Sequence, residues 1–178
     1  IMVRKANLMI TKGLFEKAAP LVFKIDEVIA NSTDMLTHKK LSNALEPLIR
    51  FYFTEAVDKG YPDKFNFFIE RLPEYIRTYR NVFEDVLRVP AKSIHENYLY
   101  AIVHNNLGLF YDSIELLDDS ESHYNKAIDS LIKSKYDNSE VMAKVLCNLG
   151  LTAAKLGKET EANTFWNKAY DIQKKMNR

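Results

Sequence analysis

Apolar residues recur at intervals of three and four along most of the chain. In the second half they form four amphipathic segments, grouped as two pairs over residues 97–134 and 138–176. Short polar breaks at residues 118–120 and 157–158 separate the two segments of each pair. Residues three and four apart share one face of a helix, so this spacing predicts helices rather than strands. We therefore expect an all-α fold without a sheet.

The two pairs of segments are copies of one another. Residues 106–109 (NLGL) recur as 148–151, and residues 125–127 (NKA) recur as 167–169; both offsets, 148 − 106 and 167 − 125, are 42. Two matches at one offset indicate an internal repeat. A glycine inside a helix costs about 1 kcal/mol relative to alanine. We therefore expect Gly108 and Gly150 to lie where two helices cross closely.

The first half of the chain, residues 1–90, is predicted to hold more degenerate helical repeats. Residues 12–18 look like the turn and second helix of a unit whose first helix is missing. Residues 34–57 have the apolar spacing of one long helix. The apolar positions over residues 65–87 continue through Pro73, which predicts either one kinked helix or two stacked helices.

Composition narrows the class of protein. Apolar residues make up 47% of the chain and charged residues 28%, with a net charge of +1. This balance gives no electrostatic reason to expect a nucleic acid or an anionic membrane as the main partner. The single cysteine, Cys147, excludes an internal disulfide and fits a reducing compartment. No stretch approaches the roughly 20 apolar residues of a membrane span, so we expect a cytoplasmic protein without membrane contact.

Residues that could perform chemistry are sparse. His95 and Glu96 begin like a helical zinc motif, but Leu99 occupies the position of the second histidine. The four histidines are scattered, and we expect each to be a surface or packing residue. Cys147 lacks the surroundings of a nucleophile. The sequence therefore predicts no catalytic residue, no metal site and no cofactor, and it disfavours an enzyme.

The second half of the chain resembles the tetratricopeptide repeat (TPR) family. The resemblance rests on a Leu-Gly pair followed at fixed spacings by an aromatic residue, a small residue, a second aromatic residue and an alanine. The first copy fills these positions with Leu107, Gly108, Tyr111, Ser120, Tyr124 and Ala127, and the second with Leu149, Gly150, Ala153, Ala162, Trp166 and Ala169. Only Ala153 departs from the pattern. The resemblance implies two TPR units with a 42-residue period over residues 91–178. Together with residues 1–90 they would form one α-solenoid of about eight antiparallel helices.

In that family the first helix of each pair lines a concave surface. The resemblance therefore implies a groove that binds a peptide or protein segment through Asn105, Asn106, Leu109, Lys144, Asn148, Leu151 and Lys155. An asparagine amide offers a donor and an acceptor, so Asn106 and Asn148 can pair with the backbone of an extended peptide. The two leucines would contact apolar side chains of the peptide, and the two lysines would meet its acidic groups. The alternative is that the asparagines bond only to neighbouring helices.

Several members of the family share these features. The long repeats and the degenerate first half resemble the Rgg/PlcR-type pheromone receptors of Gram-positive bacteria. That resemblance implies the sensor region of a quorum-sensing transcription regulator, which contacts DNA only through a domain absent from this chain and could form a homodimer. The alternative is a TPR scaffold or adaptor, either stand-alone or like the kinesin light chains, whose repeats have the same length. A phosphatase-type regulator matches less well, because no segment resembles its N-terminal helical bundle. A co-chaperone clamp ranks last, because only Asn106 and Lys144 fall in place for it.

Overall fold

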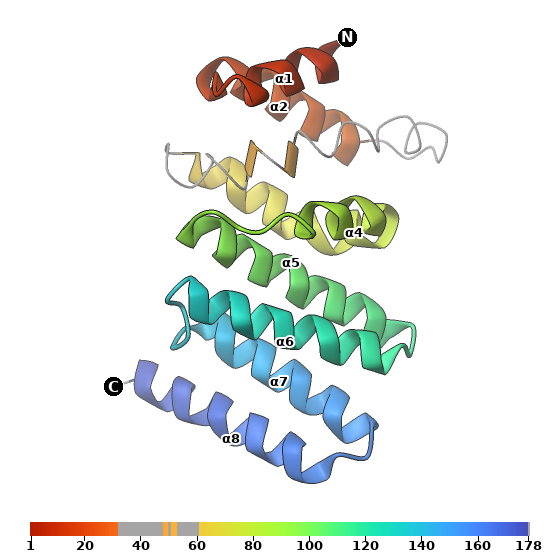
Figure 1. The fold of residues 1–178 in the computed structure, drawn as a ribbon, viewed down its shortest axis with the longest axis vertical. Helices are drawn as coiled ribbons and strands as arrows, with labels where there is room; N and C mark the ends of the chain where they lie inside the picture. The colour runs from red at the N-terminus through yellow and green to blue at the C-terminus, as the bar shows by residue number, and fades with distance from the viewer. Residues whose placement is uncertain (32–47, 50, 53–60, 178) are drawn as a thin grey trace. The chain divides into compact units, whose positions relative to one another are not determined.

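A computed structural model describes residues 1–31, 48–49, 51–52 and 61–177 of the chain (Figure 1). Seven helices and no strand are found in this described part, which confirms the all-α class. The predicted helix over residues 34–57 lies outside the described residues except at 48–49 and 51–52, which are helical. The structure divides into two compact units, Ile1–Val89 and Pro90–Arg178.

The first unit contains α1 (Met2–Thr11), α2 (Phe15–Ala30) and α4 (Pro62–Leu87). The predicted absence of a helix before residues 12–18 is wrong, because α1 occupies that place and packs against α2. Ala6 and Ile10 are the buried residues of α1. A tight turn at Gly13, with φ of +70°, joins the two helices.

The helix α4 is interrupted by a kink, as the apolar pattern through Pro73 had left open. The backbone leaves helical geometry at Tyr79, where φ is −126° and ψ is 28°, rather than at the proline. The buried side of α4 presents Phe68, Leu72 and Ile76 to the core.

A buried carboxylate joins three segments of the first unit. The carboxylate of Asp26 in α2 accepts hydrogen bonds from the hydroxyl groups of Tyr52 (3.0 Å) and Tyr75 (2.7 Å). Burial raises the pKa of Asp26, and the two phenol bonds act in the opposite direction. Burial and the nearby carboxylate also raise the pKa of both tyrosines, which keeps their hydroxyl groups protonated as donors. The ring of Tyr52 stacks on Phe68 with centroids 4.5 Å apart.

The second unit consists of α5 (Ile94–Ser113), α6 (Leu117–Lys133), α7 (Glu140–Lys155) and α8 (Glu159–Met176). Each helix packs against the next (Figure 1). The helix α5 also contacts α7. The first helix of each pair begins at a serine cap. The hydroxyl group of Ser93 accepts from the backbone N–H of Glu96 (3.0 Å), and that of Ser139 accepts from the N–H of Met142 (3.2 Å).

Both copies of the repeat contain the same close helix crossing. A Cβ atom on Gly108 would lie 2.6 Å from the ring of Tyr124, and one on Gly150 would lie 2.4 Å from the indole of Trp166. The two pairs are equivalent at the 42-residue offset, since 150 − 108 and 166 − 124 are both 42. The prediction that these glycines mark close crossings is confirmed.

The turns between the paired helices are also equivalent. The chain adopts a left-handed conformation at Glu115 (φ 61°) after α5 and at Gly157 (φ 77°) after α7. Glycine enters this region without strain, whereas a residue with a Cβ atom is disfavoured there. One backbone conformation therefore recurs in both copies with different residues.

Candidate peptide-binding surface

The seven predicted site residues all lie on the first helices of the two pairs. Asn105, Asn106 and Leu109 come from α5, and Lys144, Asn148, Leu151 and Lys155 come from α7. None of the seven is buried. We call these residues the α5/α7 surface.

Three polar contacts connect α5 with α7, and two of them involve residues of the α5/α7 surface. The side-chain amide of Asn148 donates to Oδ1 of Asn105 (3.1 Å), and Nζ of Lys155 pairs with Oδ2 of Asp112 (2.7 Å). Each of these two contacts joins residues 43 positions apart, and the two contacts are about two helical turns from one another. The two helices therefore run side by side in the same direction.

Two exposed leucines lie between these contacts along the helices. Leu109 is 44% exposed and Leu151 is 55% exposed. Leu109 follows Asn105 by one helical turn, and Leu151 follows Asn148 by one turn. The α5/α7 surface thus has an aliphatic centre with polar groups on both sides.

The asparagine amides are used only in part within the chain. Nδ2 of Asn106 donates to the backbone carbonyl of Ile102 in its own helix (2.9 Å), whereas Asn148 bonds to Asn105 on the neighbouring helix. An amide side chain has two N–H donors and a carbonyl acceptor with two lone pairs. Each of these bonds occupies one such position, so all three asparagines retain capacity for a ligand.

Both lysines of the surface are paired with acidic residues of this chain. Lys144 contacts Glu140 one turn earlier in α7 (2.7 Å), and Lys155 contacts Asp112 in α5. Sequence reasoning assigned both lysines to acidic groups of a ligand, and their partners in the structure are intramolecular.

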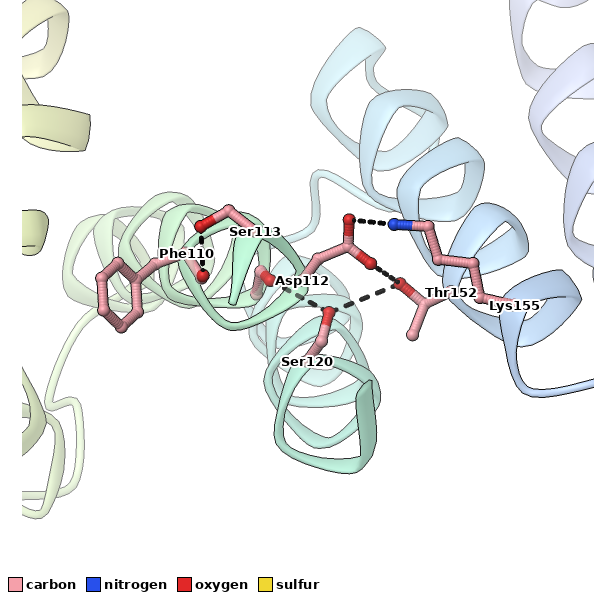
Figure 2. Close-up of polar contacts among 7 residues, drawn as sticks. Phe110, Asp112, Ser113, Ser120, Thr152 and Lys155 are labelled. Atoms are coloured by element: carbon pink, nitrogen blue, oxygen red, sulfur yellow. Dashed lines mark hydrogen bonds and ion pairs between the residues drawn. The ribbon is translucent and has the colours of Figure 1, made fainter. Parts of the chain in front are cut away.

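A buried polar cluster continues from the Lys155 contact into the interface between the two copies (Figure 2). Thr152 is buried, and its hydroxyl group lies 3.4 Å from Oδ1 of Asp112 and 3.4 Å from Oγ of Ser120. The buried Ser120 in turn donates to the carbonyl of Gly108 (2.9 Å). A second ion pair, Lys158 to Glu121 at 2.8 Å, lies beside this cluster. We call Asp112, Ser120, Glu121, Thr152, Lys155 and Lys158 the interhelix clamp.

Sequence reasoning missed the role of Asp112 and Thr152 in this clamp. Residues 42 apart occupy equivalent positions in the two copies. Their side chains therefore project from α5 and α7 in the same direction and do not face one another. The contacting pairs are offset by 43 for Asn105–Asn148 and Asp112–Lys155 and by 40 for Asp112–Thr152. The available signal was a seven-residue spacing of polar residues, from Asn105 to Asp112 on α5 and from Asn148 to Lys155 on α7.

Two histidines contact each other between α5 and α6. Nδ1 of His104 lies 3.0 Å from Nδ1 of His123, so one ring donates and the other accepts. Burial, assisted by His123 and Lys126, lowers the pKa of His104 to about 3. The ring of Tyr111 stacks on His123 with centroids 5.2 Å apart. His104 is therefore a neutral packing residue.

The described residues hold no group of three or more His, Cys, Asp or Glu side chains placed to bind a metal ion. None of the helices seen in the structure is both long enough and apolar enough to cross a bilayer. No protein-family model matches the chain, and no curated protein or solved structure shows significant similarity to it.

Proposed function

We propose that the α5/α7 surface binds an extended peptide or protein segment and performs no chemistry on it. The observation that carries this proposal is the Asn105–Asn148 amide pair, which lies one turn from the exposed Leu109 and Leu151 on two parallel helices. An extended backbone needs donors and acceptors together, and amides supply both. Its side chains need apolar contacts, which the leucines supply.

The intramolecular ion pairs define the ligand further. Lys144 and Lys155 are already neutralised by carboxylates of this chain. A ligand therefore gains little from acidic side chains on this surface, since exposed ion pairs contribute about 0–1 kcal/mol. We propose that the preferred segment is uncharged and carries aliphatic side chains.

Two more specific functions follow from the sequence resemblance to TPR proteins. The recurrence of the glycine–aromatic crossing in both copies supports a TPR-like arrangement of the second unit. Within that arrangement, we propose the sensor region of a bacterial transcription regulator that takes a short signalling peptide. A TPR adaptor that takes a segment of another protein is the alternative. The source of the ligand distinguishes the two, because the regulator takes a peptide that exists free, whereas the adaptor takes a segment that remains part of another protein.

A peptide array with matched variants tests the binding surface. We expect the double variant Leu109→Ser/Leu151→Ser to lose the aliphatic peptides that the unaltered chain retains. Ile132→Ser is the control, because Ile132 is a comparably exposed aliphatic residue on α6, outside the α5/α7 surface. A double variant that retains every ligand would refute the proposal. A loss shared with Ile132→Ser would assign the effect to general surface hydrophobicity.

A further inference from the structure

Two tyrosines lie against each other near the N-terminal ends of α5 and α7. Tyr98 belongs to α5, and Tyr136 lies in the connection between α6 and α7. Their ring centroids are 4.5 Å apart and their planes are tilted by 37°. Tyr98 is partly buried against the core of the second unit, whereas Tyr136 is 43% exposed. We call Tyr98 and Tyr136 the tyrosine pair.

The tyrosine pair continues the α5/α7 surface along the helix axes. On α5, Tyr98 precedes Asn105 by seven residues, and Asn105 precedes Asp112 by seven, since 105 − 98 and 112 − 105 are both 7. Seven residues complete about two helical turns, so the three side chains leave α5 along nearly one line. Asn105 and Asp112 contact α7 from this line. Tyr98 therefore lies on the same side of α5 as the groups that we assign to the ligand.

The backbone that carries Tyr136 is held in place from both sides. Its N–H donates to the carbonyl of Leu131 near the end of α6 (2.9 Å), and its carbonyl accepts from the hydroxyl group of Ser139 (2.6 Å). The same hydroxyl group accepts from the N–H of Met142 and caps α7. The exposed ring is thus presented from a fixed backbone, which reduces the conformational entropy that a ligand would have to offset.

The charges beside the tyrosine pair favour a neutral side chain of the ligand. Burial raises the pKa of Tyr98, Tyr136 raises it further, and Lys144 acts in the opposite direction, so Lys144 lies close to the pair. Lys144 would repel a cationic side chain, and its own charge is already paired with Glu140 at 2.7 Å. An anionic side chain would meet the negative faces of the rings. An aromatic side chain has neither disadvantage and packs on other rings in offset or tilted geometries.

We propose that the tyrosine pair is an aromatic subsite of the α5/α7 surface, and that the bound segment carries an aromatic side chain for it. This inference rests on the proposed function, because it takes the extended segment as the ligand. The surface would then recognise two features of one segment, namely aliphatic side chains at Leu109 and Leu151 and a ring at the tyrosine pair.

The geometry of α5 sets the spacing of these two features in the ligand. Within the second unit the surface is carried by two parallel helices, so its long direction is that of the helix axes. Tyr98 precedes Leu109 by 109 − 98 = 11 residues, which is about 16 Å at the rise of an α-helix. An extended segment covers about 3.3 Å per residue and spans this distance in about five residues. Because its side chains alternate between two sides, the ring is expected about four or six positions from the aliphatic residue.

A peptide series with a movable ring tests the subsite. The probes are blocked, dye-labelled peptides of serine and threonine that carry one leucine–threonine–leucine segment. A single phenylalanine is moved one position at a time away from this segment, in either direction. We expect the affinity, measured by fluorescence anisotropy, to be highest with the ring about four to six positions from the nearer leucine. A phenylalanine adjacent to the leucines should give no gain, and neither should an arginine at the best position.

Variants of the protein locate the ring of the ligand. Tyr136→Ser should weaken the best phenylalanine peptide by about three- to tenfold, the effect of one aromatic pair. It should leave the affinity of the phenylalanine-free peptide unchanged, which also shows that the variant is folded. Tyr136→Phe should bind like the unaltered chain, because the ring makes the contact. Tyr170→Ser is the control, since Tyr170 is an exposed tyrosine on α8, outside the α5/α7 surface.

The outcomes separate the subsite from the proposed function. The subsite alone is overturned by equal affinity at every ring position, by unchanged affinity in Tyr136→Ser, or by equal losses in Tyr136→Ser and Tyr170→Ser. An arginine peptide that matches the phenylalanine peptide would also overturn it, because the pair would then accept a cation. The peptide surface itself fails if Leu109→Ser/Leu151→Ser retains the phenylalanine-free peptide. Absence of binding by every peptide would overturn both.

Discussion

At the scale of single residues, the two helical glycines face rings with different freedom to move. Tyr124 is enclosed, whereas Trp166 is partly exposed and is held only by a long hydrogen bond of 3.4 Å from its indole N–H to the carbonyl of Cys147, so we expect its ring to have more room to move. We expect Gly108→Ala to destabilise the protein by about 1–3 kcal/mol through overpacking. In Gly150→Ala the gain in helix propensity, about 1 kcal/mol, should offset much of the strain. Thermal unfolding of the two variants compares them, and equal losses would show that both rings are equally fixed.

The left-handed turn residues give a second comparison between the copies. Glu115 holds a conformation that Gly157 adopts freely at the equivalent position. We expect Glu115→Gly to stabilise the protein by about 1 kcal/mol, because a left-handed residue with a Cβ atom costs about 1–2 kcal/mol. Gly157→Ala should destabilise it by a similar amount. Urea unfolding measures both variants, and a destabilised Glu115→Gly would contradict this account.

At the scale of the helices, the interhelix clamp combines a buried hydroxyl group with a partly exposed ion pair. Thr152→Val keeps the shape of the side chain but removes the group that lies between Asp112 and Ser120. We expect it to cost about 1 kcal/mol at any salt concentration. Lys155→Met should cost less than about 1 kcal/mol, and only at low salt. Urea unfolding at two ionic strengths distinguishes them; a salt-dependent loss in Thr152→Val would contradict this assignment.

At this scale, the features that could be predicted from the sequence are those that depend on the spacing of residues along one helix. The Leu-Gly pairs indicated the close crossings, because a helix position without a side chain lets the ring of Tyr124 or Trp166 approach the backbone. The partners across α5 and α7 could not be read in the same way, since they depend on how far one helix is shifted along the other. The three-way contact of Tyr52, Asp26 and Tyr75 was missed for a related reason: it joins three segments that no local pattern connects.

At the scale of the whole molecule, the two units are expected to respond to acid in opposite directions. The pKa of His104 is lowered from 6.5, its ordinary value, to about 3 in the folded protein. As the pH falls, the unfolded state therefore takes up a proton before the folded state does. The stability that neutral His104 contributes in the second unit is therefore present above pH 6.5 and is lost toward pH 3. Between pH 7 and pH 5 this loss should reach about 2 kcal/mol.

Asp26 acts in the other sense in the first unit. Its pKa is raised above 3.8, so the folded state binds the proton first. The resulting stabilisation is present below pH 3.8 and is lost as the pH rises through the raised value. Hydrogen exchange measured by unit at several pH values checks both effects. His104→Asn should flatten the response of the second unit, and Asp26→Asn that of the first; unchanged responses would show that other groups control them.

The interhelix clamp also affects whether folded molecules can join into open-ended filaments. A protein whose repeats are nearly identical can stack one molecule on the next, head to tail, and such contacts build open filaments when they do not close into a ring. Lys155 and Lys158 pair with Asp112 and Glu121 of the first copy, whereas the second copy has Ala154 and Asn163 at the equivalent positions. Because these polar residues occur in one copy alone, α7/α8 packs more favourably on α5/α6 of its own molecule than on a second molecule. The clamp therefore counteracts polymerisation of the folded protein.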